Sequence, residues 1–251
     1  MNSYKEKLKN RLMVRKGNGL YEVTDIYNFL DKRKLYSLTK DGFLSKIAWE
    51  SDEVEKAKIQ ELNNIQKERK NKQKPEFLKI KYSALINDAN QIVLQPSANY
   101  LNIPLYQADE LPDFIETARF YQPGDVLTFD FESNSPLCFS NTIIKEEYLE
   151  EFVLKRKEGF CLESHDFPHI IISQKADNSG FIIIGKQDCQ KQEIQLAGFN
   201  IPLGSAIYLP ENIIHSDAYL VGEYRIAFTA ANHYQFYKFD IDEPLRFMPL
   251  V

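Results

Sequence analysis

The feature that most constrains this chain is a series of short segments, rich in branched and aromatic residues, that begins near Phe77. Glycine and proline residues separate these segments, as turn residues separate β-strands. The clearest segments are residues 91–94, 100–106, 126–131, 181–184, 194–196, 205–209, 224–228 and 234–239. Regularly spaced short strands are typical of a β-sandwich or barrel. We therefore predict a mainly β domain, a barrel, over residues 76–251.

The first 75 residues have a different pattern and predict a helical extension. Thr24 or Asp25 is suited to cap a helix that runs to Leu35, in which Ile26 and Phe29 lie on one face. A second helix is predicted from Ser51 to the proline at position 75, with acidic residues early and basic residues late. Its apolar stripe is narrow, which suits packing on a neighbouring element or on a second copy in a homodimer.

One further helix is predicted inside the β region. Asn141 or Thr142 is suited to cap it, and Gly159 to terminate it. Between them, apolar residues repeat at helical spacing at positions 144, 148, 149, 152 and 153.

Charge is distributed unevenly along the chain, whose net charge is −5. Residues 1–75 carry 18 Lys and Arg against 11 Asp and Glu, whereas residues 76–251 carry 13 against 25. A basic arm is attracted to nucleic acid and to anionic membrane surfaces. A charge count is a weak signal, however, and an arm that is solvated or lies on its own acidic body is the favoured interpretation. We do not expect a nucleic-acid partner.

The compartment is predicted from what the sequence does not contain. It has no run of eighteen apolar residues, and its lysine-rich start is unlike a signal peptide. A cytoplasmic protein without a membrane span is therefore expected. Cys138, Cys161 and Cys189 have no metal-site spacing, so buried, reduced thiols are expected.

The four histidines all lie in the last 90 residues and are the main chemical signal. In an extended segment, residues two apart share a face, so Glu163, His165 and His169 would point to one side if the chain stays extended through Pro168. Imidazole nitrogens and a carboxylate oxygen inside a barrel are suitable ligands for a divalent transition metal. Two or three histidines with one carboxylate leave positions open for substrate or dioxygen, as in non-haem iron sites.

The region around His215 resembles the second motif of the cupin family. In that motif a glycine is followed after five residues by a proline and, five residues later, by the metal-binding histidine, as in Gly204, Pro210 and His215. The family's glycine after the proline is Asn212 here, a residue that tolerates the same left-handed backbone.

The first cupin motif is matched less closely. Gly159 and His165 fit its spacing, but Phe167 stands at the position of the second histidine. A register shifted by two places Glu163 and His165 at the paired positions and His169 at the glutamate position. The resemblance implies a double-stranded β-helix barrel with a cupin-like core at residues 159–240. The turn at Pro123 and Gly124 resembles the turn that precedes the histidine in cupins, so residues 77–140 could form a second, degenerate barrel half. The alternative, which we favour, is that these residues add flanking strands to a single barrel.

These observations predict a cupin-type, metal-dependent oxidoreductase, dioxygenase-like, that acts on a small molecule. Iron(II) is the expected cofactor, and the expected ligands are His165, His169, His215 and Glu163. Phe167, Tyr208 and Tyr219 are predicted to line the substrate site, although aromatic side chains also fill barrel cores. His233 is predicted to be a packed or hydrogen-bonded strand residue. Two alternatives stay open: a non-catalytic ligand-binding or regulatory barrel whose basic arm binds a partner, and metal-free acid–base catalysis by His215.

Overall fold

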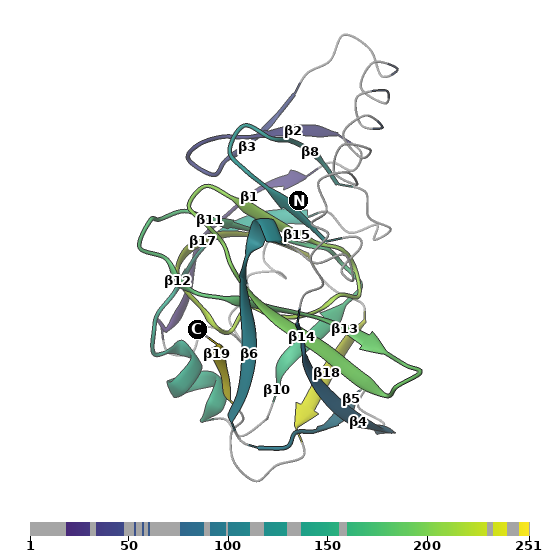
Figure 1. The fold of residues 1–251 in the computed structure, drawn as a ribbon. Helices are drawn as coiled ribbons and strands as arrows, with labels where there is room; N and C mark the ends of the chain where they lie inside the picture. Colours follow the sequence, from purple (N-terminus) through teal and green to yellow (C-terminus); the bar gives the residue numbers. More distant parts are fainter. Residues whose placement is uncertain are drawn as a thin grey trace.

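A computed structural model describes residues 19–30, 34–47, 53, 57, 60, 76–87, 91–98, 100–110, 118–129, 137–155, 160–229, 233–239 and 246–250. This part of the chain is mainly β. Its helical elements include a 3-10 turn, η3 (Ala108–Glu110), and one short helix, η4 (Leu149–Leu154); residues 53, 57 and 60 are also helical. Three sheets are stacked as layers, with the smallest sheet at the top of Figure 1.

The middle layer is an antiparallel seven-stranded sheet. Its strands pair in the order β1 (Tyr21–Leu30), β9 (Leu137–Ile144), β17 (Leu220–Phe228), β11 (His169–Ser173), β15 (Ala206–Leu209) and β7 (Arg119–Tyr121), and β12 (Ser179–Gly180) also pairs with β17. Every residue of β11 is buried, because other layers cover both faces of this strand.

The lower layer is a nine-stranded sheet. Its order is β13 (Ile182–Asp188), β16 (Ile214–Ser216), β10 (Phe160–His165), β18 (Tyr234–Phe239), β5 (Gln91–Gln95), β4 (Leu78–Asn87), β14 (Glu193–Asn200), β6 (Tyr100–Gln107) and β19 (Arg246–Leu250). Because β13 also pairs with β14, the strands from β13 to β14 in this order form a closed seven-stranded ring. The upper layer is the three-stranded sheet β3 (Leu44–Lys46), β2 (Leu35–Leu38) and β8 (Val126–Thr128).

Two apolar clusters lie between and within these layers. The larger cluster joins residues of the nine-stranded sheet, such as Ile184 and Phe199, to Ile171 and Ile207 of the middle sheet. The smaller cluster joins the other face of the middle sheet, including Ile170, to the three-stranded sheet. The middle sheet therefore has apolar contacts on both faces, which explains the nearly continuous apolar runs of its central strands β11 and β15.

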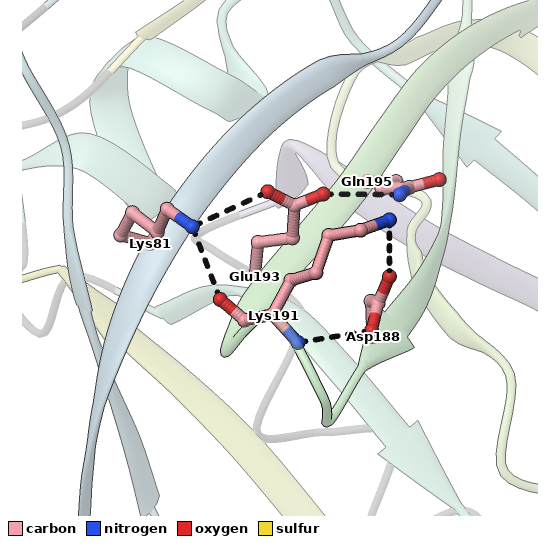
Figure 2. A network of polar contacts seen from close by, with 5 residues as sticks. All are labelled: Lys81, Asp188, Lys191, Glu193 and Gln195. Atoms are coloured by element: carbon pink, nitrogen blue, oxygen red, sulfur yellow. Dashed lines mark hydrogen bonds and ion pairs between the residues drawn. The ribbon is translucent and has the colours of Figure 1, made fainter.

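The hairpin between β13 and β14 is fixed by polar contacts (Figure 2). Lys81 on β4 lies opposite Glu193 in the strand register, and its Nζ is 3.6 Å from Glu193 Oε2. The same ammonium donates a hydrogen bond to the carbonyl of Lys191 at 3.0 Å, and Lys191 Nζ donates to Asp188 at 2.9 Å. That last contact lowers the pKa of the Asp188 carboxyl and raises the pKa of the Lys191 ammonium. Opposite charges are paired throughout this network, so its role is structural.

Most of the predicted strands are confirmed. Residues 91–94, 100–106, 205–209 and 234–239 correspond to β5, β6, β15 and β18 within one or two residues, and the other predicted strands overlap β8, β13, β14 and β17. Between residues 77 and 140, β4, β5, β6, β7 and β9 join sheets that also contain later strands, whereas β8 pairs with β2 in the three-stranded sheet.

The predicted helix between Thr24 and Leu35 is wrong, because this segment forms β1 and pairs with β9. The register shifts between Val23 and Asp25 and again between Tyr27 and Phe29. Such irregularities break the two-residue alternation, and the apolar residues then fall at spacings that resemble a helix. Of the second predicted helix, only residues 53, 57 and 60 are described; they are helical and exposed, and the rest lies outside the described residues. No N-terminal helical extension is seen in the described part of the chain.

The third predicted helix is shorter than expected. Asn141 and Thr142, the predicted caps, lie within β9, and the helix η4 follows Tyr148. Branched residues at the end of β9 favour the strand, since their side chains pack well on a pleated sheet.

The cysteines agree with the expected burial only in part. Cys138 is buried as expected, whereas Cys189 is exposed in the turn after β13. Among the described residues, no helix is long and apolar enough to cross a membrane.

Candidate metal centre

Four side chains that could hold a metal ion converge between the middle and lower sheets. Glu163 and His165 lie two residues apart on β10, His215 lies on the adjacent strand β16, and His169 is the first residue of β11. Their ligand atoms all lie within 4.8 Å of one another. This is the only such group of three or more His, Cys, Asp or Glu side chains in the described part of the chain.

The strand register explains how residues distant in sequence meet. Glu163 lies directly opposite His215 in the antiparallel pair β10–β16, so the two side chains share a face. His165, two residues further along β10, points to the same face. His169 reaches the group from the middle sheet. The sequence therefore brings the ligands together through one strand pair, β10–β16, and the bend between β10 and β11.

The three imidazoles surround a common point. Their ring centroids lie 4.6 Å apart for His165 and His169, and 4.8 Å apart for each pair that includes His215. The ring planes are inclined to one another by 71° to 79°. All three side chains are buried. Rings arranged in this way present edges toward one another, and the edge carries the nitrogen lone pairs.

Backbone carbonyl groups fix which nitrogen faces the centre. The Nδ1 atoms of His165 and His215 lie 2.8 Å from the carbonyl oxygens of Phe167 and Ile213, and His169 Nδ1 lies 3.1 Å from that of Ala227. A carbonyl oxygen only accepts hydrogen bonds, so each Nδ1 carries the proton. In the neutral ring Nε2 then has the lone pair, which is the protonation that a metal ligand needs.

The Nε2 atom of His215 tests whether the group suits a metal. Among the described residues, no partner lies within hydrogen-bonding distance of this buried atom. Glu163 Oε1 is 3.9 Å away, too far for a hydrogen bond. A buried polar atom without a partner costs free energy, and such atoms are usual where an ion or water is bound.

The distances suit a metal if the donor atoms draw closer together. Ligand atoms about 2.0–2.2 Å from one ion lie about 3–3.6 Å apart when adjacent and at most about 4.4 Å apart when opposite, against the 4.8 Å limit here. Three nitrogens and one carboxylate oxygen form a donor set suited to divalent transition metals. The cluster of Glu163, His165, His169 and His215 could therefore hold such an ion.

The segment between His165 and His169 differs from the expected extended strand. The chain bends at Asp166 and Phe167, and Pro168 precedes β11 in the other sheet. The Asp166 N–H donates a hydrogen bond to the carbonyl of His233 at 3.3 Å, which holds the bend against the residue before β18. His169 consequently joins the cluster from a second layer, although the sequence predicted it on the same strand face.

The turn before His215 is built as its sequence predicts. Asn212 has a φ of 64°, in the left-handed region, and its N–H donates to the carbonyl of His165 at 2.8 Å. This hydrogen bond ties the start of the β16 region to the end of β10. The backbone of one predicted ligand thereby positions the strand that carries another.

Replacing Asn212 with alanine is expected to lower the free energy of unfolding by about 1 kcal/mol, because alanine tolerates the left-handed conformation less well. Asn212→Gly should change it by only a few tenths of a kcal/mol, since glycine adopts this φ without strain. Urea unfolding of the three proteins measures both differences. Equal losses in the two variants would show that the side chain, and not the backbone conformation, is what matters.

The structure places the other predicted site residues at varied distances from the cluster. Phe167 stacks on His165, with ring centroids 3.6 Å apart. Tyr208 lies opposite Ile170, the neighbour of His169, so strand alternation points it to the other face, where it packs on Phe129. Substrate contact by any of these aromatic residues stays a prediction.

Tyr219 and His233 do not belong to the cluster. Tyr219 is buried against Phe181, and its hydroxyl accepts a hydrogen bond from the N–H of Phe247 at 3.0 Å. Substrate contact by Tyr219 is likewise untested. His233 is exposed and lies just before β18, so the expectation of a packed strand residue is wrong. It is hydrogen-bonded through its backbone, since its carbonyl accepts from the Asp166 N–H at 3.3 Å.

The contribution that sequence reasoning missed comes from the backbone. Phe167, Ile213 and Ala227 orient the imidazoles through carbonyl groups, for which no side-chain pattern exists. Two of these acceptors, the carbonyl groups of Phe167 and Ile213, lie two residues from the histidine that they orient, so only these two contacts are local in sequence. Comparison of the chain with protein-family models, curated proteins and solved structures finds no match.

Proposed function

We propose that this protein is a metal-dependent oxidoreductase of the cupin type, dioxygenase-like, that acts on a small molecule with iron(II). The observation that carries the proposal is the group of four donors, three of them buried imidazoles whose Nδ1 atoms face carbonyl oxygens. Such an arrangement has little use as a packing device, because apolar side chains would fill the same space at lower cost.

The order of the strands supports the cupin assignment. Omitting the two-residue strand β12, the eight strands from β9 to β17 divide equally between two sheets, in the orders β9-β17-β11-β15 and β14-β13-β16-β10. Numbered along the chain, these orders are 1-8-3-6 and 5-4-7-2. Two facing sheets of four strands with long crossings between them form a jelly roll, the architecture to which cupins belong. The candidate ligands lie on the second, third and seventh of these strands.

The chain's own residues would define the chemistry as follows. Carbonyl groups hold each imidazole in the tautomer that donates its Nε2 lone pair. Burial of the histidines excludes water and strengthens electrostatic interactions within the site. His165, His169, His215 and Glu163 would hold a redox-active metal, which would supply open positions for substrate or dioxygen.

Glu163 marks the side from which a small molecule would enter. Its side chain is 12% exposed, against 2% for His215. Its neighbour across the other strand pair is Phe236 on β18, which is only partly buried. Two other described neighbours of the histidines, Phe167 and Ile184, are buried. A substrate would therefore approach past Glu163 and Phe236.

The proposal is tested by anaerobic reconstitution of the full chain with iron(II), followed by metal analysis and electron paramagnetic resonance. We expect one iron per chain. Nitric oxide, used as a stand-in for dioxygen, should give the characteristic iron–nitrosyl signal if the metal has an open position. A chain without stoichiometric iron, or with iron that gives no nitrosyl signal, would contradict the proposal. Retention of zinc alone would contradict the redox assignment.

A further inference from the structure

One apolar residue contacts the candidate metal centre in two different ways. Phe167 lies in the bend between β10 and β11, and its side chain is 4% exposed. Its ring lies parallel to that of His165, with an interplanar angle of 7° and a centroid distance of 3.6 Å. Its carbonyl oxygen is the acceptor 2.8 Å from Nδ1 of the same histidine.

These two contacts restrain different motions of the His165 ring. The hydrogen bond fixes the tautomer and keeps Nδ1 directed at the bend. The parallel ring limits tilting of the imidazole plane, because any tilt would bring atoms of one ring into those of the other. Together they direct Nε2 toward the point at which the other donors meet.

The Phe167 ring also contacts a second candidate ligand. Its centroid lies 5.2 Å from that of His169, and the two planes are inclined by 70°. His165 belongs to the lower sheet and His169 to the middle sheet. One side chain thus rests against a histidine from each layer, which an ordinary core phenylalanine need not do.

We propose that Phe167 is a positioning residue of the metal centre, whose ring and carbonyl group hold His165 in the orientation that binds metal. This inference rests on the proposed function, since it concerns the same ligands. The phenyl ring of Phe167 offers no atom that could bind a metal. Its effect acts through the imidazoles, so its loss should alter how a metal is bound even when the protein stays folded.

The test compares cobalt(II) binding by the full-length wild type, Phe167→Leu and Phe129→Leu. Leucine keeps the backbone carbonyl group and most of the apolar volume but removes the flat ring. Phe129 is the matched control, because it is buried in the same apolar cluster and its ring neighbours are Tyr36 and Tyr208. Cobalt(II) is chosen because its visible absorption reports on ligand geometry.

We expect Phe167→Leu to weaken cobalt(II) binding roughly ten-fold, the lower end of the range for residues that support metal ligands, and to change its visible spectrum. Phe129→Leu should lower stability while leaving the affinity within two-fold and the spectrum unchanged. Phe167→Met serves the same comparison if the leucine variant does not fold.

Three results would overturn the inference. If the wild type binds cobalt(II) and Phe167→Leu binds it with the same affinity and spectrum, the positioning role is wrong and the proposed function stands. The positioning role is equally wrong if Phe129→Leu weakens binding as much as Phe167→Leu does. If the wild type binds no cobalt(II), the metal centre itself is refuted and the inference falls with it.

Discussion

Replacing His215 with alanine is expected to weaken iron(II) binding by roughly 100-fold or more. Loss of a residue that merely supports a ligand already costs 10- to 100-fold in affinity, and here a ligand itself is removed. The substitution deletes a donor that lies opposite Glu163 and equally distant from the other two rings. Anaerobic competition with a chromogenic chelator measures the affinity of both proteins.

The matched control is His233→Ala, which removes an exposed imidazole outside the cluster. It should bind iron(II) with unchanged affinity. The chelator titration should therefore separate the two variants clearly, and circular dichroism should show that both remain folded. If both variants bind iron(II) as the wild type does, the cluster is not the site. Equal weakening in both would show that the titration reports non-specific binding.

The largest expected effect on stability is for Phe199→Ala, which should lower the free energy of unfolding by about 3–5 kcal/mol. Phe199 on β14 is completely buried and packs near Tyr106, with ring centroids 5.9 Å apart. It also lies opposite Ile182 in the β13–β14 pair, so its loss leaves a cavity in the larger apolar cluster. Denaturant unfolding monitored by tryptophan fluorescence and circular dichroism measures the change.

Leu203→Ala provides the comparison for this variant. Leu203 follows β14 by three residues but is 50% exposed, so its truncation should change stability by less than about 0.5 kcal/mol. A small loss for Phe199→Ala, similar to that for Leu203→Ala, would be inconsistent with burial of Phe199 in a close-packed interior.

The β-character of residues 76–251 could be predicted because the strands leave local signals. Branched and aromatic residues between turn residues predicted β18 at its observed bounds and most other strands to within a few residues. The pairing of those strands could not be predicted. It joins β10 to β16 and β11 to β17, more than 50 residues apart in the chain, and no local pattern specifies such contacts.

The N-terminal error has a particular cause. The apolar residues of β1 match a helical period because two irregularities interrupt the strand, and the sequence contains no glycine or proline that would mark them. The strand is stabilised by pairing with β9, whose residues are more than 100 positions away. A tertiary contact thus decides against the conformation that local spacing favours.

The members of the candidate centre were predictable from residue type and motif spacing, whereas their geometry was not. The expected face of one continuous strand holds for Glu163 and His165 only. His169 joins them because the chain bends at Pro168 and crosses to the other sheet. The two-residue spacing of Glu163 and His165, extended to His169, therefore predicted the members of the cluster, but its assumption of one continuous strand is wrong for His169.

That crossing links the site to the integrity of the whole molecule. Since His169 belongs to one layer and its three companions to another, the layers cannot slide past each other without separating the donor atoms. Partly folded states that keep either sheet alone would lack the complete set. An ion that prefers the complete set would raise the melting temperature in proportion to the logarithm of its concentration, and a chelator would lower it. Thermal melts at graded metal concentrations would consequently report on the contact between two sheets.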